Sequence, residues 1–407
     1  MRNYRFIAAL ILTYMLFGIL LNSVGTVILQ SIMSLGQTKS SAAILEAFKD
    51  MPIAVTSFLI ASFLPRIGYR RAMMLGVGAV GAACLTMPLA PGFATTKLLF
   101  AITGVSFALV KVATYSSIGL VTDDSAKHAS LTSFIEGLFM VGVLSGYWIF
   151  GAFIDPADPA SLGWLNVYWL LSALCAAIIT LLAATSLDES AAQGGTHSAA
   201  EDFWAMVKLT ARPLVILFVV SAFLYVLIEQ AIGTWLPTFN NDVLHLPQVM
   251  SIRAASIFAA MLAIGRLSAG AVLTRIGWYP LVNLCLVATA LLVAISLPLT
   301  RDLLPNPGVT WSTVPIAAYI LPLIGLFLAP IYPAINSAIL SSLPKHNHAA
   351  MTGLLVVFSA LGGTTGSYIT GQVFAAFDGQ TAFYLSIIPM ALLLISLGGF
   401  RRLQVRA

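Results

Sequence analysis

The sequence predicts an all-α membrane protein in which twelve transmembrane helices form two pseudo-symmetric six-helix bundles. Three observations lead to this prediction: the composition, the recurrence of apolar runs along the chain, and a repeat that relates its two halves. Of the 407 residues, 59% are hydrophobic and only 9% are charged, whereas about a quarter of the residues in a soluble domain are charged. The mean hydropathy is +0.96. This composition excludes a soluble globular protein, and the alternating strands of a membrane β-barrel are absent from the sequence.

The apolar runs are long enough to cross a bilayer as helices, which takes about 20 residues each. Charged residues, Gly/Pro clusters and Asn/Asp residues separate one run from the next. The twelve spans that we expect are residues 6–33, 43–65, 72–91, 96–121, 129–154, 162–187, 212–239, 249–274, 279–299, 312–341, 349–377 and 381–400.

Basic residues are distributed unevenly between the loops. If the N-terminus is cytoplasmic, 13 Lys and Arg residues fall on the cytoplasmic face and 4 on the other. Cytoplasmic loops of membrane proteins carry the excess of Lys and Arg. We therefore expect a multi-pass protein of the cell (inner) membrane with both termini in the cytoplasm. The net charge of +5 has the same explanation, so we expect no nucleic-acid partner.

The longest polar stretch, residues 188–211, contains Gly194 and Gly195 and has the composition of a flexible linker. It predicts a division into an N-terminal bundle (1–187), a cytoplasmic linker (188–211) and a C-terminal bundle (212–407).

Short motifs repeat in the same order in the two halves, which indicates an internal duplication. Arg66-Ile-Gly after the second span matches Arg275-Ile-Gly after the eighth. The fifth and eleventh spans carry matching glycines, namely Gly142, Gly146 and Gly151 against Gly362, Gly366 and Gly371. We expect these glycines to allow close helix packing rather than to bind a substrate.

These features resemble the major facilitator superfamily over essentially the whole chain. Arg66, Gly68 and Arg70 match the basic motif that ends helix 2 in that family, but Ala61 and Pro65 replace its first Gly and its Asp. The resemblance implies a transporter fold with Arg66 and Arg70 in a gate. The acidic partner expected at that turn is missing.

Within the superfamily, the stretches around Glu229 and Trp235 in helix 7, and around Pro330 and Pro333 in helix 10, resemble the fucose permease-like sugar porters. That branch implies sugar transport with proton coupling. Tyr147 stands where the drug-antiporter motif of helix 5 has Pro, which counts against a multidrug antiporter.

No nucleophile–base pattern, metal-binding pattern or ATP-binding loop is present. We therefore expect a protein that is not an enzyme and that has no cofactor and no metal. The three cysteines, Cys84, Cys175 and Cys285, lie in apolar runs without paired spacing.

Ionisable residues inside the spans are the best functional candidates, because each costs roughly 2.5–3.5 kcal/mol at the centre of a membrane helix. Lys111 lies midway along helix 4, with Tyr115 one turn further on the same face. We interpret Lys111 either as a substrate-binding cation or as part of a buried ion pair with Glu136 or Asp50. Glu46 and Lys49 are expected at a solvated end of helix 2.

Two roles are predicted for the remaining charged groups. Glu136 and Arg266 lie at matching depths, so they are candidates for a latch between the halves, with separate static contacts as the alternative. Glu229 is the first candidate for proton coupling, on the assumption that it is buried without a permanent cation. Asp50 is the second. The alternative for Glu229 is a carboxylate that does not titrate.

The polar and aromatic residues expected to line a substrate site are Asn22, Lys111, Tyr115, Gln230, Trp235, Tyr332 and Asn336. Asn, Gln, Tyr and Trp side chains suit a hydroxylated or amphipathic solute. Helix 10 contains four prolines, Pro315, Pro322, Pro330 and Pro333, which predict either a hinge or a curved helix.

The sequence as a whole therefore predicts a monomeric secondary transporter of a small organic solute, sugar-like or an organic anion. It works by alternating access and is coupled to protons as a symporter. The alternatives are a proton-coupled exporter of small amphipathic molecules and a membrane receptor that does not transport.

Overall fold

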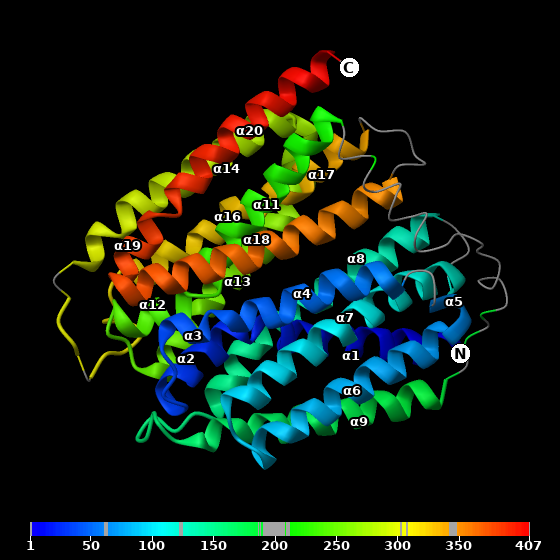
Figure 1. Ribbon diagram of the computed structural model, residues 1–407, viewed down its shortest axis with the longest axis horizontal. Helices are drawn as coiled ribbons and strands as arrows, with labels where there is room; N and C mark the ends of the chain where they lie inside the picture. The colour runs from blue at the N-terminus through cyan, green and yellow to red at the C-terminus, as the bar shows by residue number, and fades with distance from the viewer. Residues whose placement is uncertain are drawn as a thin grey trace. The chain divides into compact units, whose positions relative to one another are not determined.

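The computed structural model describes residues 2–60, 64–121, 125–185, 187, 189, 208, 212–301, 303–306, 308–341 and 348–406. Within these residues the secondary structure is helical, with no strand (Figure 1). This confirms the predicted all-α class. Most of the predicted linker, 188–211, lies outside the described residues.

The chain forms two compact units. Unit 1 comprises Met1–Val24 and Phe48–Asp202, and unit 2 comprises Gly25–Ala47 and Phe203–Ala407. The segment 25–47 thus belongs to unit 2, although it precedes most of unit 1 in the sequence.

Unit 1 is built from seven helices and one 3₁₀ turn, with α4 starting in unit 2 and continuing into unit 1. Their bounds are α1 Arg2–Asn22, α4 Ile44–Ile60, α5 Leu64–Ile67, α6 Tyr69–Leu89, α7 Phe93–Val121, α8 Ser125–Ala152, η1 Leu162–Asn166 and α9 Val167–Ala183. Among the longest of these, α6 packs against α7 and α9, and α1 packs against α8.

Unit 2 contains the remaining helices. Their bounds are α2 Val24–Ser34, α3 Lys39–Ala42, α11 Pro213–Gly233, α12 Leu236–Asp242, α13 Gln248–Ile276, α14 Trp278–Ser296, η3 Pro298–Thr300, α15 Ala317–Ile320, η4 Leu321–Leu323, α16 Ile324–Leu328, α17 Ile331–Ser341, α18 His348–Ala376, α19 Gly379–Tyr384 and α20 Ile387–Arg406. Helix α11 packs against α18 and α20, and α3 packs on α18.

Eleven of the described helices are long and apolar enough to cross a membrane. Helix α4, at the position of the second predicted span, is not among them. It has 17 residues and contains Glu46, Lys49 and Asp50 in its first half. Together with α4, which carries three charged residues, these helices fit a twelve-span protein.

Prolines interrupt the tenth predicted span. A 3₁₀ turn containing Pro322 separates α15 from α16, and a turn at Ala329–Pro330 separates α16 from α17. Proline removes a backbone donor and its ring clashes with the preceding turn, which weakens the α-helical hydrogen bonding at these positions. Whether these breaks act as a hinge remains a prediction.

The matching glycines allow close helix contacts, as expected. A Cβ added to Gly142 of α8 would lie 2.3 Å from the carbonyl oxygen of Met15 in α1. A Cβ added to Gly362 of α18 would lie 2.3 Å from the carbonyl oxygen of Phe223 in α11. The same small-residue contact therefore recurs in both units, in agreement with the repeat in the sequence.

Candidate functional site

Unit 1 holds a polar group inside three packed helices. The hydroxyl of Tyr115 on α7 donates a hydrogen bond to Oε1 of Glu136 on α8. Tyr14 of α1 is 1% exposed and meets the ring of Tyr115 edge to face, with the ring centres 6.3 Å apart. Residues of three helices thus meet beside the Glu136 carboxylate.

Aromatic rings surround this group. The ring centre of Tyr14 lies 6.4 Å from that of Phe107 and 6.0 Å from that of Phe139. Lys111, one turn before Tyr115 on α7, has its Nζ 5.7 Å from the centre of the Phe107 ring. A cation near an aromatic face is a favourable arrangement. The Lys111 side chain is half-buried.

Unit 2 holds an ion pair. Arg266 Nη2 on α13 lies 3.2 Å from Glu229 Oε1 on α11, and their side chains are 43% and 15% exposed. The assumption that Glu229 lacks a cation partner is therefore wrong. The two residues lie on adjacent packed helices, whereas the sequence only allowed the depth of each to be counted along its own helix.

Glu136 and Arg266 each have a partner within their own unit, Tyr115 and Glu229 respectively. The predicted latch between Glu136 and Arg266 joins the two units, and it stays a prediction.

Tyrosines lie beside the ion pair of unit 2. The rings of Tyr225 on α11 and Tyr332 on α17 have their centres 5.5 Å apart. Asn336 follows Tyr332 by one turn, and both side chains are half-buried. These two predicted substrate residues therefore share one face of α17.

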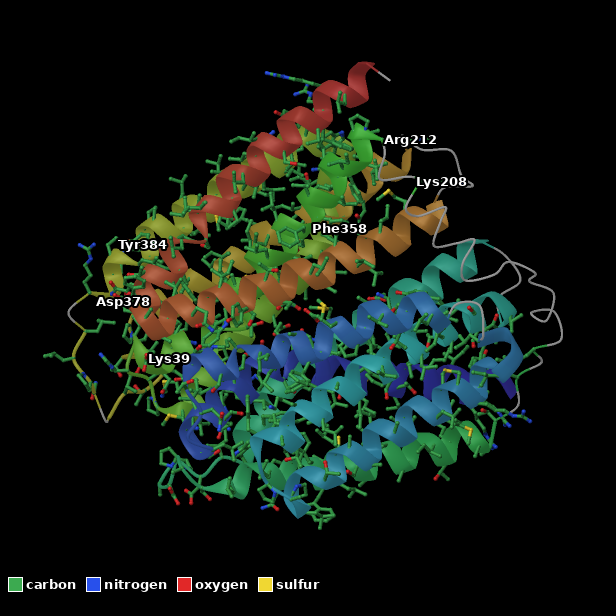
Figure 2. The ribbon with its side chains drawn as sticks, in the orientation of Figure 1. Lys39, Lys208, Arg212, Phe358, Asp378 and Tyr384 are labelled. Carbon is green, nitrogen blue, oxygen red and sulfur yellow. The ribbon has the colours of Figure 1, made fainter. Side chains whose placement is uncertain are left out.

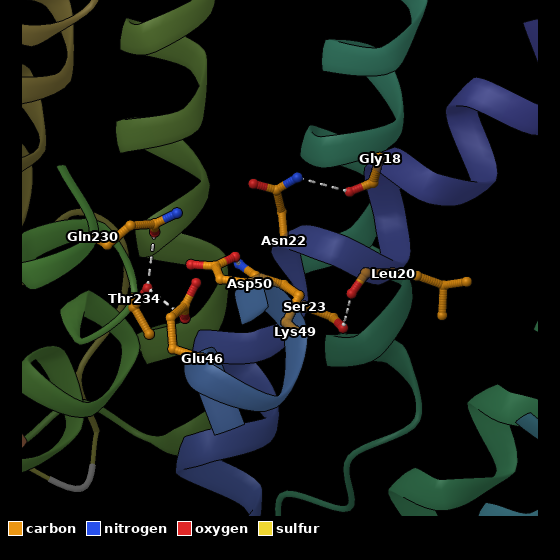
Figure 3. Close-up of polar contacts among 9 residues, drawn as sticks. All are labelled: Gly18, Leu20, Asn22, Ser23, Glu46, Lys49, Asp50, Gln230 and Thr234. Carbon is orange, nitrogen blue, oxygen red and sulfur yellow. Dashed lines mark hydrogen bonds and ion pairs between the residues drawn. The ribbon is translucent and has the colours of Figure 1, made fainter. Parts of the chain in front are cut away.

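A second buried carboxylate lies in unit 2 and was not predicted as a site. Glu46 at the start of α4 is 0% exposed. The hydroxyl of Thr234, at the end of α11, lies 3.1 Å from Glu46 Oε2 and 3.0 Å from Oε1 of Gln230 (Figure 3). The expectation of a solvated helix end is thus wrong for Glu46, because α11 covers it.

Asp50 and Lys49 form an ion pair on α4, with Lys49 Nζ 3.5 Å from Asp50 Oδ1. They are 8% and 5% exposed, so the solvated-end expectation is also wrong for Lys49. Asp50, the second candidate for proton coupling, has this lysine beside it.

Two predicted substrate residues are engaged in other contacts. Trp235 is 0% exposed, and its indole nitrogen donates to the carbonyl oxygen of Ser367 at 2.9 Å. Its ring also packs against that of Phe374, and its role in substrate binding stays a prediction. The amide nitrogen of Asn22 donates to the carbonyl oxygen of Gly18, 3.1 Å away in its own helix (Figure 3).

The basic turn after α4 contains a carboxylate that the family motif did not predict. Glu189 accepts hydrogen bonds from the backbone N–H groups of Tyr69 (2.7 Å) and Arg70 (3.0 Å) at the start of α6. Arg70 in turn donates to the carbonyl oxygen of Thr185. A carboxylate from distant sequence thus lies at this turn, where the family motif has an acid at the position of Pro65. The side chain of Arg66, the other predicted gate residue, lies outside the described part.

No group of three or more His, Cys, Asp or Glu side chains that could hold a metal occurs among the described residues. The three cysteines are buried and unbridged.

The sequence of residues 7–364 matches the Major Facilitator Superfamily. The chain belongs to this family. The match spans both units and agrees with the helical fold, so the protein is a multi-pass membrane transporter. No curated protein sequence matches the chain.

Solved transporter structures have the same fold. A bacterial homologue of the human lysosomal transporter Spinster, in an inward-facing and occupied conformation, superposes with a TM-score of 0.74 at 16% identity, covering 100% of this chain and 97% of that one. The nucleoside transporter NupG superposes with a TM-score of 0.72 at 15% sequence identity, covering 96% of this chain and 98% of that one. The D-xylose-proton symporter superposes with a TM-score of 0.70 at 13% sequence identity, covering 96% of this chain and 97% of that one. At these identities the likeness shows the fold alone.

Proposed function

We propose that this chain is a proton-coupled symporter that takes up a small organic solute by alternating access. The observation that carries the proposal is the placement of ionisable groups inside the helices of both units. Lys111, Tyr115 and Glu136 meet the aromatic group of unit 1, and Glu229 and Arg266 pair in unit 2. Charges at such depth are costly in a membrane and mark substrate or ion pathways.

Lys111 is the proposed contact for an acidic or hydroxyl group of the solute. Its ammonium group supplies up to three donors, and Phe107 offers an apolar face beside it. This combination suits a solute with a polar or anionic group and a planar or apolar part. The polar side chains of Tyr332 and Asn336 are the proposed contacts in unit 2.

Glu229 is proposed to link proton binding to movement through its ion pair. A carboxylate that takes up a proton loses its charge, so protonation at Glu229 weakens its attraction for the Arg266 guanidinium group. Arg266 is the proposed partner of Glu136 in the predicted latch once the pair with Glu229 is weakened.

Purified protein in proteoliposomes tests the proposal. D-xylose, a nucleoside and an aromatic carboxylate are first compared by thermal shift, because ligand binding stabilises the native state by RT ln(1 + [L]/Kd). Uptake of the stabilising compound is then measured with and without an inward proton gradient. Solute accumulation that does not depend on the proton gradient contradicts proton coupling.

Lys111→Met tests the substrate contact, and Lys97→Met on the same helix is the matched control. Lys97 lies near the ring of Phe93 in the first turn of α7. We expect Lys111→Met to abolish the thermal shift while the protein remains folded, and Lys97→Met to retain it. An unchanged shift in Lys111→Met contradicts the assignment.

A further inference from the structure

Four exposed arginines lie at one end of unit 2. They are Arg212 just before α11, Arg275 in the last turn of α13, and Arg401 and Arg402 in the last part of α20. Figure 2 shows Arg212 at the end of the unit where α20 finishes, with Asp378 and Tyr384 at the other end. The predicted topology places the arginine end on the cytoplasmic side of the membrane.

Contacts between α11 and α20 fix their relative direction. The hydroxyl oxygens of Ser221 on α11 and Ser396 on α20 lie 2.9 Å apart. A Cβ added to Gly399 of α20 would lie 3.1 Å from Cδ1 of Leu217 on α11. The second contact is earlier on α11 and later on α20 than the first, so the two helices are antiparallel. The start of α11, with Arg212, therefore lies towards the end of α20.

Aromatic side chains at the start of α14 contact one of the arginines. The guanidinium carbon of Arg401 lies 4.2 Å from the centre of the Tyr279 ring, which is a cation–π contact. The ring centre of Trp278 lies 5.4 Å from that of Tyr279 and 5.5 Å from that of Phe400 on α20. Helices α14 and α20 lie side by side (Figure 1). Stacking occupies the face of a guanidinium group and not the N–H donors at its edge.

The four arginines have no carboxylate partner in the part of the chain that the structure describes. The ion pairs described above join other residues. The sequence around the arginines also lacks acids, because the stretches 243–301 and 379–407 contain no Asp and no Glu. The positive charge at this end of unit 2 therefore favours an anion from outside the chain.

An exposed apolar stripe on α20 leads towards the arginines. Ile388, Leu392 and Ile395 are exposed and follow one another at spacings of four and three residues. Arg402 follows Ile395 by two turns, so it lies over the same face of the helix. Helix α20 is long and apolar enough to cross a membrane. A phospholipid with an acyl chain along this stripe would have its headgroup beside Arg402.

We propose that this end of unit 2 binds an anionic phospholipid of the cytoplasmic leaflet. Arg401 and Arg402 bind its phosphate, and the stripe on α20 holds an acyl chain. Guanidinium groups match the geometry of phosphate oxygens. Trp and Tyr side chains are common at the level of lipid headgroups, and clustered basic residues on the cytoplasmic side attract anionic lipids. None of these residues belongs to the groups proposed for solute transport, so failure of one proposal leaves the other standing.

The thermal stability of purified, delipidated protein in detergent measures the binding, because a bound lipid stabilises the native state according to its Kd. Phosphatidylglycerol is compared with phosphatidylcholine of the same acyl chains, since both have a phosphate but only phosphatidylglycerol has a net negative charge. We expect phosphatidylglycerol to bind about 25-fold more tightly, or about fivefold for each of the two arginines in contact. Equal binding of the two lipids refutes the proposal.

Glycerol 3-phosphate, added as a competitor, distinguishes a lipid site from a site for a soluble anion. It has the phosphate group but no acyl chains, so it should not displace phosphatidylglycerol at equal concentration. Displacement would show that the apolar stripe on α20 contributes nothing and would overturn the assignment to a lipid.

Single substitutions test the two arginines. Arg401→Gln and Arg402→Gln should each weaken the binding of phosphatidylglycerol about fivefold and leave that of phosphatidylcholine unchanged. Arg301→Gln is the matched control, because Arg301 is an exposed arginine that follows the other end of α14. All three variants lose one positive charge. An equal loss of binding in Arg301→Gln would assign the lipid preference to net charge and contradict the site.

Tyr279→Leu covers the case in which the loss of an arginine impairs membrane insertion. It keeps every charge and removes the ring that Arg401 contacts. The Kd for phosphatidylglycerol should rise about two- to fivefold, the change expected from one cation–π contact near the surface. Tyr368→Leu on α18 is the control, since Tyr368 is also exposed to the surroundings. An unchanged Kd in Tyr279→Leu, or an equal rise in Tyr368→Leu, means that the proposed site is wrong.

Discussion

Replacing two glycines of α8 should have opposite effects on stability. Gly137 has no atom within 4 Å of an added Cβ, and Gly142 has the carbonyl oxygen of Met15 at 2.3 Å. Ala at an open helix position gains about 0.5–1 kcal/mol over Gly. At Gly142 the same gain is offset by about 1–3 kcal/mol for forcing a methyl group into packed backbone. Gly137→Ala should therefore stabilise the protein, and Gly142→Ala should destabilise it by up to about 2.5 kcal/mol.

Thermal unfolding in detergent, followed by the loss of monodisperse protein on heating, measures the two variants side by side. Gly362→Ala on α18 provides a second test, because its added Cβ would also lie 2.3 Å from a carbonyl oxygen, that of Phe223. Equal midpoints for the Gly137 and Gly142 variants would show that the α1–α8 contact is not as close as described. The reasoning on helix packing would then fail for both units.

Three further predictions concern single contacts. Glu189→Ala removes the acceptor of two backbone N–H groups at the start of α6, so the free energy of unfolding should fall by about 1–2 kcal/mol. Lys208→Ala is the control, because Lys208 is exposed, and it should leave the unfolding midpoint unchanged. Trp235→Phe leaves the buried Ser367 carbonyl without its indole donor. The free energy of unfolding should fall by about 1–3 kcal/mol, measured by thermal unfolding as above. A double-mutant cycle of Glu229→Gln and Arg266→Gln in detergent should give a coupling free energy below about 1 kcal/mol, because Arg266 is partly exposed. A larger coupling free energy would mean that the pair is shielded from solvent.

The features that could be predicted from the sequence are those that depend on composition and local pattern. The apolar runs gave helices of the expected order, and the glycine spacing of the fifth and eleventh spans marked two real close contacts. Pro322 and Pro330 marked real interruptions of helix 10. Each of these signals comes from residues within a single span, so it can be recognised without knowing which distant segment packs against that span.

The partners of buried charged groups could not be predicted in the same way. Counting residues from a helix end gives a depth but not the direction in which a side chain points. Glu229 therefore seemed to have no cation, although Arg266 lies one helix away. Glu189 was missed because the acid was expected at Pro65, and no local pattern shows that a carboxylate 124 positions later in the sequence reaches the same turn.

Glu46 shows most clearly where the local argument ends. Its position in the first turn of α4, with Lys49 three residues later, is typical of a solvated helix start. What buries it is the approach of α11, and that approach depends on Gly25 in a different helix, which lets the Thr234 backbone come close. A sequence-based prediction of this site would have had to combine three separate observations: a glycine in the first span, an acid in the second, and a Gln-x-x-x-Thr pair in the seventh. The repeat brings the first and third together, since Gly25-Thr26 matches Gly233-Thr234, but it has no counterpart for the acid. The contact that buries Glu46 therefore depends on residues of three predicted spans, of which the repeat relates only two.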